Sequence, residues 1–159
     1  MSGERVSRAR SKRQGKKRRD RRRALRRTLT QRVKRNFPDQ KVIVGPTSDG
    51  IKMSDVLEEF VEPYRQFAET EDAYRKLLML AIVAWNVTLF AEKDRLSSLD
   101  ELLATLPEEA REDGREIIRE LMARKQRFFS QHRRMIIDFE LTGTAEDWHL
   151  SVMSTAHSV

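Results

Sequence analysis

The positive and negative charges of this chain are separated along its length, and this separation most constrains how the chain can fold. Residues 1–41 contain 18 Lys and Arg against 3 Asp and Glu, a net charge of +15, whereas the remainder has 14 against 22, a net charge of −8. A segment so charged and so poor in apolar residues buries too little surface to offset the entropy lost when its backbone is ordered. The sequence therefore predicts a basic, Arg-rich arm over residues 1–40 and a single folded domain over residues 41–159.

The arm is predicted to have two parts. Residues 1–23 are of low complexity and are expected to be disordered in isolation. From Ala24 onward, apolar residues recur every fourth position among arginines, which predicts an amphipathic helix that forms conditionally and ends before Pro38. These apolar residues are Leu25, Leu29, Val33 and Phe37.

The domain is predicted to be α+β and mainly helical, with three to four helices and a C-terminal β-hairpin. Apolar residues at three-to-four spacing predict helices over about 54–68, 71–91, 99–105 and 108–131. Pro63 is expected to kink the first of these rather than end it. Ser98 and Glu101 form a capping box that predicts the start of the third. In the last helix, Gly114 lies on an apolar seam, which predicts close approach of another helix. That seam comprises Ala110, Gly114, Ile117, Leu121 and Phe128, and it is widened by Ile118, Met122 and Phe129.

After His132 the apolar period changes from helical spacing to two, which predicts a hairpin over about 134–155. In the first strand, Met135, Ile137, Phe139 and Leu141 alternate with Ile136, Asp138 and Glu140, and Thr142–Gly143–Thr144 is expected to end the run as part of the turn. Residues 42–44 are expected to form a short strand that can join this hairpin.

The most apolar stretch, Leu77 to Ala91, predicts the central helix of the core. It has 15 residues, fewer than the roughly 18 to 20 that cross a bilayer, so no integral membrane association is expected. Trp85 is interpreted as a core anchor, and Asn86 would need a hydrogen-bond partner if it is buried.

The arm predicts a nucleic-acid partner, with RNA favoured over DNA. Arginine presents forked donors that bridge phosphate oxygens, and its planar group also stacks on unpaired bases. The candidate phosphate-binding residues are Arg13, Lys16, Lys17, Arg18, Arg19, Arg21, Arg22, Arg23, Arg26, Arg27, Arg32 and Arg35. Arg133 and Arg134, where the last helix passes to the first strand, are candidates for additional phosphate contacts.

Other interpretations of the arm stay open. It can be a targeting or solubility tail, or it can bind an anionic membrane surface or an acidic protein. In the main alternative, the protein is an interaction module or adaptor: the seam around Gly114, or the apolar stripe of the arm, docks on a protein partner, and the charge only steers association.

No catalytic signature, metal site or cofactor motif is recognised, so a non-enzymatic protein is expected. The carboxylates of residues 108–120 alternate with arginines at helical spacing, which favours ion pairs along that helix over a metal site. None of the three histidines has a nucleophile, second histidine or carboxylate at a diagnostic spacing. Because the chain has no cysteine, nothing favours secretion, and a cytoplasmic location is expected.

Overall fold

The computed structural model describes residues 41–47, 49–104, 107–144 and 146–156, together with Asp20, Arg27, Gln31 and Arg35, which are helical. The chain divides into two units between residues 39 and 40. The fold is that of the second unit, Gln40–Val159. The disordered or conditionally helical arm predicted over residues 1–40 otherwise lies outside the described residues.

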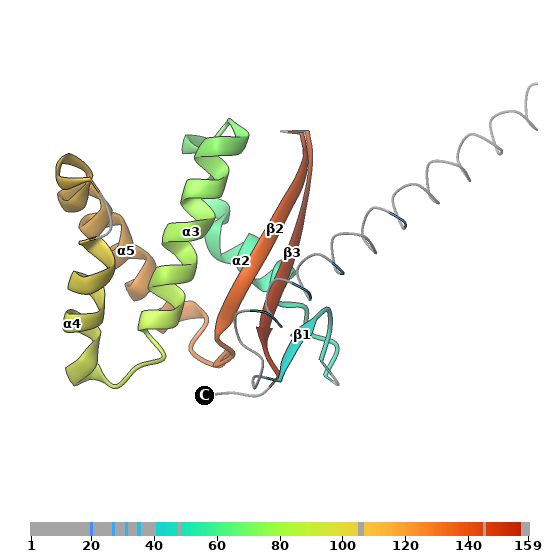
Figure 1. Ribbon diagram of the computed structural model, residues 1–159, viewed down its shortest axis with the longest axis horizontal. Helices are drawn as coiled ribbons and strands as arrows, with labels where there is room; N and C mark the ends of the chain where they lie inside the picture. The colour runs from blue at the N-terminus through green and yellow to red at the C-terminus, as the bar shows by residue number, and fades with distance from the viewer. Residues whose placement is uncertain are drawn as a thin grey trace, which may run out of the picture. The chain divides into compact units, whose positions relative to one another are not determined.

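The second unit confirms the predicted α+β class, with four α-helices and a C-terminal antiparallel hairpin among its described residues (Figure 1). Two 3-10 helices, η1 and η2, accompany them. In chain order the elements are β1 (Val42–Val44), α2 (Met53–Val61), η1 (Glu62–Phe67), α3 (Glu71–Val87), α4 (Glu92–Leu103), η2 (Glu108–Ala110), α5 (Arg111–Phe128), β2 (Ile136–Thr144) and β3 (Asp147–Thr155).

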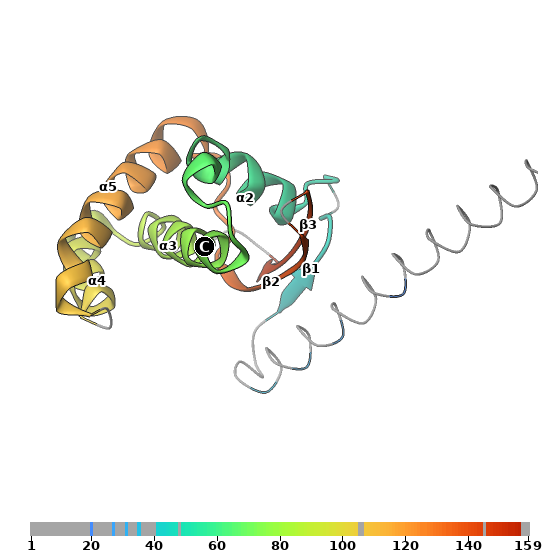
Figure 2. The same ribbon diagram turned by 90° about the horizontal axis from the view of Figure 1, so that it is seen from above.

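Helix α3 is the centre of the core. It contacts β2, α2, α4 and α5, and it lies between the sheet and the α4–α5 pair (Figure 2). Thr70 starts α3 as expected for a cap, because its side-chain oxygen accepts a hydrogen bond from the Ala73 N–H at 3.2 Å. Trp85 is fully buried and makes edge contacts with Phe60, which confirms it as a core anchor. No helix in the described part of the chain is long and apolar enough to cross a membrane.

The sheet has three antiparallel strands in the order β1-β3-β2. Residues 42–44 pair with β3, as the sequence predicts, with Val42 opposite Thr155. The predicted turn is wrong, because β2 continues through Thr144, which pairs with Asp147. Gly143 allows this continuation: its φ is +105°, and an added Cβ would collide with the Asp147 carbonyl oxygen.

The alternation expected in β2 does not extend over the whole strand. Ile136 and Leu141 are buried and Phe139 packs against the core, so the residues that face the core are even-numbered at one end and odd-numbered at the other. The register with β3 shifts between Ile136 and Asp138. Such an irregularity inserts one residue and reverses which face the following side chains occupy. A strict period of two therefore cannot describe both ends of β2.

Two helices begin or end at residues other than those that the sequence predicts. The first does not continue past Pro63 as a kinked α-helix: α2 ends at Val61, and the chain continues as η1, since proline removes a donor from the helical ladder. The third begins at Glu92, so Ser98 lies inside α4 and does not cap it. Its early turns are charged and exposed, and they give little apolar signal until Leu99 and Leu103, which are buried.

Two adjacent side chains of α3 make hydrogen bonds to the backbone at the start of β2. Asn86 donates through Nδ2 to the Ile136 carbonyl oxygen at 2.8 Å and accepts from the Ile136 N–H at 2.9 Å. Trp85 donates through Nε1 to the Arg134 carbonyl oxygen at 2.9 Å. The partner that Asn86 was expected to need is therefore the backbone at the start of β2.

We expect Asn86→Ala to lower the free energy of unfolding by about 2 to 3 kcal/mol, because both backbone groups of Ile136 lose their partner. Urea denaturation followed by circular dichroism measures this. Ser97→Ala is the matched control: it removes an exposed side-chain hydrogen bond to Asp94 and should change stability by less than about 0.5 kcal/mol. Equal stability of the two variants would show that the hydrogen bonds between Asn86 and Ile136 do not stabilise the fold.

Candidate functional site

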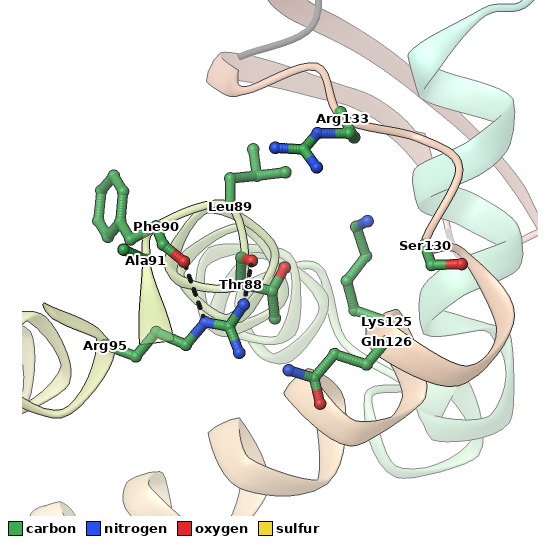
Figure 3. A pocket seen from close by; sticks show the side chains of 9 residues that line it. All are labelled: Thr88, Leu89, Phe90, Ala91, Arg95, Lys125, Gln126, Ser130 and Arg133. Atoms are coloured by element: carbon green, nitrogen blue, oxygen red, sulfur yellow. Dashed lines mark hydrogen bonds between the residues drawn. The ribbon is translucent and has the colours of Figure 1, made fainter. Parts of the chain in front are cut away.

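A pocket of about 460 Å³ lies where the C-terminal ends of α3 and α5 meet the start of α4. Arg95 reaches it from α4, Lys125 and Gln126 from α5, and Ser130 and Arg133 from the chain between α5 and β2. Figure 3 shows the charged ends of Arg95, Lys125 and Arg133 around this space. The described lining residues include no Asp or Glu. The pocket is therefore positively charged, although residues after 41 carry a net charge of −8.

Lys125 is the most buried of the three cations, with 2% of its surface exposed. Its Nζ donates to the carbonyl oxygens of Phe129 at 2.7 Å and His132 at 2.8 Å. The same nitrogen lies 4.2 Å from the ring centre of Trp85, where the negative face of the indole attracts a cation. Two carbonyls and one aromatic face surround this ammonium, so it can act as a fixed charge but is poorly placed to act as a nucleophile.

Burial lowers the pKa of two basic groups near the end of α5. Burial, followed by the positive charge of Arg133, lowers the pKa of Lys125 from 10.5 to about 8. Lys125 is therefore still charged at neutral pH. Burial first, and the charge of Lys125 second, also lower the pKa of His132, whereas Glu59 and Asp49 oppose this shift.

Arg95 makes hydrogen bonds to backbone carbonyls that follow α3. Its Nε donates to the Phe90 carbonyl oxygen at 3.1 Å, and its Nη2 donates to the Thr88 carbonyl oxygen at 3.0 Å (Figure 3). Carbonyls at a helix C-terminus lack partners within the helix, and a cation there also complements the helix dipole. Arg95 and Lys125 thus have the same structural role, at the ends of α3 and α5.

The two adjacent arginines predicted as phosphate contacts have different surroundings. Arg133 is exposed and lines the pocket. Arg134 is half-buried, with Nε donating to the Thr155 carbonyl oxygen at 2.9 Å and Nη2 donating to Ser154. Arg134 therefore ties the start of β2 to the end of β3, and these contacts engage two of its guanidinium nitrogens.

Of the twelve predicted phosphate-binding residues in the arm, Arg27 and Arg35 are described, and both are exposed. The other ten lie outside the described residues. They are Arg13, Lys16, Lys17, Arg18, Arg19, Arg21, Arg22, Arg23, Arg26 and Arg32.

Sequence reasoning missed Arg95 and Lys125. The buried face of α5 consists of Gly114, Ile118, Leu121 and Lys125, whereas the predicted seam included Ile117 and Phe128, which are exposed. A lysine in phase with a buried helical face was a signal available in the sequence. Arg95 had no such signal, because it lies in an exposed and highly charged helical turn.

The ion pairs expected along α5 are partly replaced by contacts with other elements. Arg115 pairs with Asp100 of α4 at 2.7 Å. Arg124 donates through Nε to the Phe60 carbonyl oxygen at 3.0 Å, at the end of α2. These arginines join α5 to its neighbours. In the described part of the chain, no group of three or more His, Asp or Glu side chains is arranged to hold a metal ion.

In comparisons with known proteins, no protein-family model, no curated protein and no solved structure matches this chain.

We expect Lys125→Met to remove a pH dependence of stability. In the folded protein Lys125 loses its proton near pH 8, and in the unfolded chain near 10.5, so the unfolded chain binds more protons between these values. Stability should therefore rise with pH in this window. Between pH 8 and 9.5 the parent should gain on the order of 2 kcal/mol relative to the variant, at about 1.4 kcal/mol per pKa unit.

Urea denaturation at pH 7.5, 8.5 and 9.5 measures this gain. Lys76→Met is the matched control, since Lys76 is exposed and forms an ion pair with Asp72 on the surface of α3. The pH dependence of the stability of this variant should follow that of the parent. An identical pH profile for parent and Lys125→Met would contradict the lowered pKa.

Proposed function

We propose that the protein binds nucleic acid without catalysing a reaction, through phosphate contacts of the basic residues in its first 40 positions. Structured RNA or a ribonucleoprotein is the favoured partner. The observation that carries the proposal is the charge separation, with +15 in residues 1–41 against −8 in the rest of the chain. Such a concentration of charge requires an acidic surface, and nucleic acid provides one charge per phosphate.

The predominance of arginine over lysine in this segment supports RNA as the partner. Most of the basic residues in this segment are arginines, and no aromatic residue precedes Phe37. Base recognition by aromatic stacking is therefore not available there, whereas guanidinium groups can bridge phosphates and stack on unpaired bases. Binding of this kind is largely electrostatic, so selectivity must come from the shape of the target or from the folded domain.

A protein-interaction module is the second candidate, and exposed apolar side chains of the domain favour it. Phe67 is 78% exposed and Leu96 66% exposed. Such side chains can contribute to a protein interface when they form a contiguous patch. In this case the basic segment would only accelerate association.

Salt dependence separates the two candidates. If the basic segment binds phosphates, the logarithm of the association constant for RNA falls linearly with the logarithm of salt concentration, with a slope of roughly 0.7 to 0.9 per phosphate contacted. Replacing Arg18, Arg19, Arg21, Arg22 and Arg23 with Gln should flatten the slope by roughly 3.5 to 4.5 and reduce affinity by orders of magnitude at low salt. Fluorescence anisotropy with labelled RNA measures both quantities.

The matched control removes five exposed positive charges from the domain, by Gln substitution at Lys52, Lys76, Lys93, Arg119 and Arg127. It changes net charge equally and should leave the slope almost intact. Lys substitution of the five arm arginines should retain most of the affinity if the contacts are simple charges, and should lose it if they are forked or stacked. No binding to any RNA or DNA at about 50 mM salt would exclude the proposal and favour the protein-interaction module.

A further inference from the structure

We propose that Phe128, at the C-terminal end of α5, stacks on an unpaired base of single-stranded RNA, together with the guanidinium group of Arg127. This inference deepens the proposed function and rests on it, since it names the form of RNA that the folded domain recognises. The carrying observation is an aromatic ring that is 54% exposed and has two arginine side chains over it. Every base has a flat aromatic face that can stack on such a ring.

The packing of α5 directs this ring towards solvent. The next residue, Phe129, is buried in the core and makes an edge contact with the ring of Phe60. Successive side chains of a helix point in different directions, so burial of Phe129 leaves Phe128 outside the core cluster. The core therefore does not explain why position 128 holds an aromatic ring.

The two arginines over the ring are held differently. Arg124 has its guanidinium carbon 5.4 Å from the ring centre of Phe128. It also donates to the carbonyl oxygens of Phe60 at 3.0 Å and Glu59 at 3.2 Å. Arg127 has its guanidinium carbon 5.1 Å from the same ring centre and is exposed. Among the described residues, its side chain makes no hydrogen bond or ion pair. Arg124 therefore supports the ring, whereas the guanidinium group of Arg127 is free to move aside.

A base can take the place of Arg127 on the ring. An exposed cation–π contact is weaker than the stacking of a base on an aromatic side chain. The planar guanidinium group of Arg127 can then stack on the outer face of the base. The base would lie between the ring and the guanidinium group. This arrangement selects unpaired bases, because the bases of a duplex are stacked on one another.

Phe128 supplies an interaction that the basic segment of residues 1–40 lacks, since no aromatic residue precedes Phe37. Phosphate contacts alone carry little information about the partner. The surroundings of the ring also favour RNA over an apolar protein segment. Residues 121–128 contain no Asp or Glu, and both side chains over the ring are cations.

The test measures how tightly the full-length chain binds labelled oligouridine, and the same strand paired with oligoadenosine, by fluorescence anisotropy. Phe128→Ala should raise the dissociation constant for the single strand about tenfold, which corresponds to about 1.4 kcal/mol and to the loss of one stacked base. The dissociation constant for the duplex should not change. The salt slope should also stay the same, because no phosphate contact is removed.

Phe67→Ala is the matched control, since it removes a phenyl ring that is 78% exposed on η1, and it should leave both dissociation constants unchanged. Phe128→Tyr keeps an aromatic ring and should retain the affinity of the parent. Arg127→Lys keeps the charge without the planar group and should weaken binding of the single strand, whereas Arg119→Lys should not. Thermal unfolding verifies that each variant folds.

Phe128→Trp gives a direct signal of stacking. The single strand should quench its tryptophan emission in a saturable manner, beyond any change seen in the parent, which contains Trp85 and Trp148. The emission of Phe67→Trp should change only as that of the parent does.

A loss of affinity for the single strand that is confined to Phe128→Ala and Arg127→Lys supports the inference. Equal affinities of Phe128→Ala and the parent would overturn it and assign the exposed ring to a protein interface, even if the salt slope confirms phosphate binding by the basic segment. An equal loss for the duplex, or in Phe67→Ala, would also overturn it. If the parent binds no RNA, the inference and the proposed function fail together.

Discussion

Three hydrogen bonds between the side chains of Trp85 and Asn86 and the backbone of Arg134 and Ile136 connect the helical part of the domain to its sheet. They come from the buried end of α3, the helix that contacts every other α-helix of the described domain. The path of the chain between α5 and β2 is thereby tied to the core of the helical layer. Because β2 begins at Ile136, the same contacts set where the hairpin starts.

This connection also accounts for the position of the pocket. Fixing Arg134 beside Trp85 brings the end of α5 next to the end of α3, so the backbone carbonyls that follow these two helices lie close together. Lys125 donates to the carbonyls that follow α5, and Arg95 to those that follow α3, which lowers the cost of burying these polar groups. Concentrated positive charge at this place is thus a consequence of how two helices end.

The sequence predicted the fold class because long, regular apolar periods dominate this domain. Apolar spacing located α2, α3, α5 and both strands of the hairpin, and the exposed, charged first turns of α4 concealed where that helix begins. The phase of β2 could not be predicted, because the shift between Ile136 and Asp138 arises from pairing with β3. The pocket could not be predicted because it also depends on tertiary contacts. Arg95 and Arg133 are far apart in the sequence, and the packing of the helices around α3 brings them to one cavity. Lys125 was the exception, since it interrupts a buried helical face.

The acidity of the domain bears on how a nucleic-acid partner would be engaged. Residues after 41 carry a net charge of −8, so most of this surface repels a polyanion, and the repulsion extends about 8 to 10 Å at physiological salt. Under the proposed function, affinity must then come from the basic segment, and the domain can approach phosphate closely only where its cations are concentrated. Repulsion by the rest of this surface would then disfavour partners whose phosphates must lie against it. Under the proposed function, the domain would in this way add selectivity to an electrostatic tether that has little of its own.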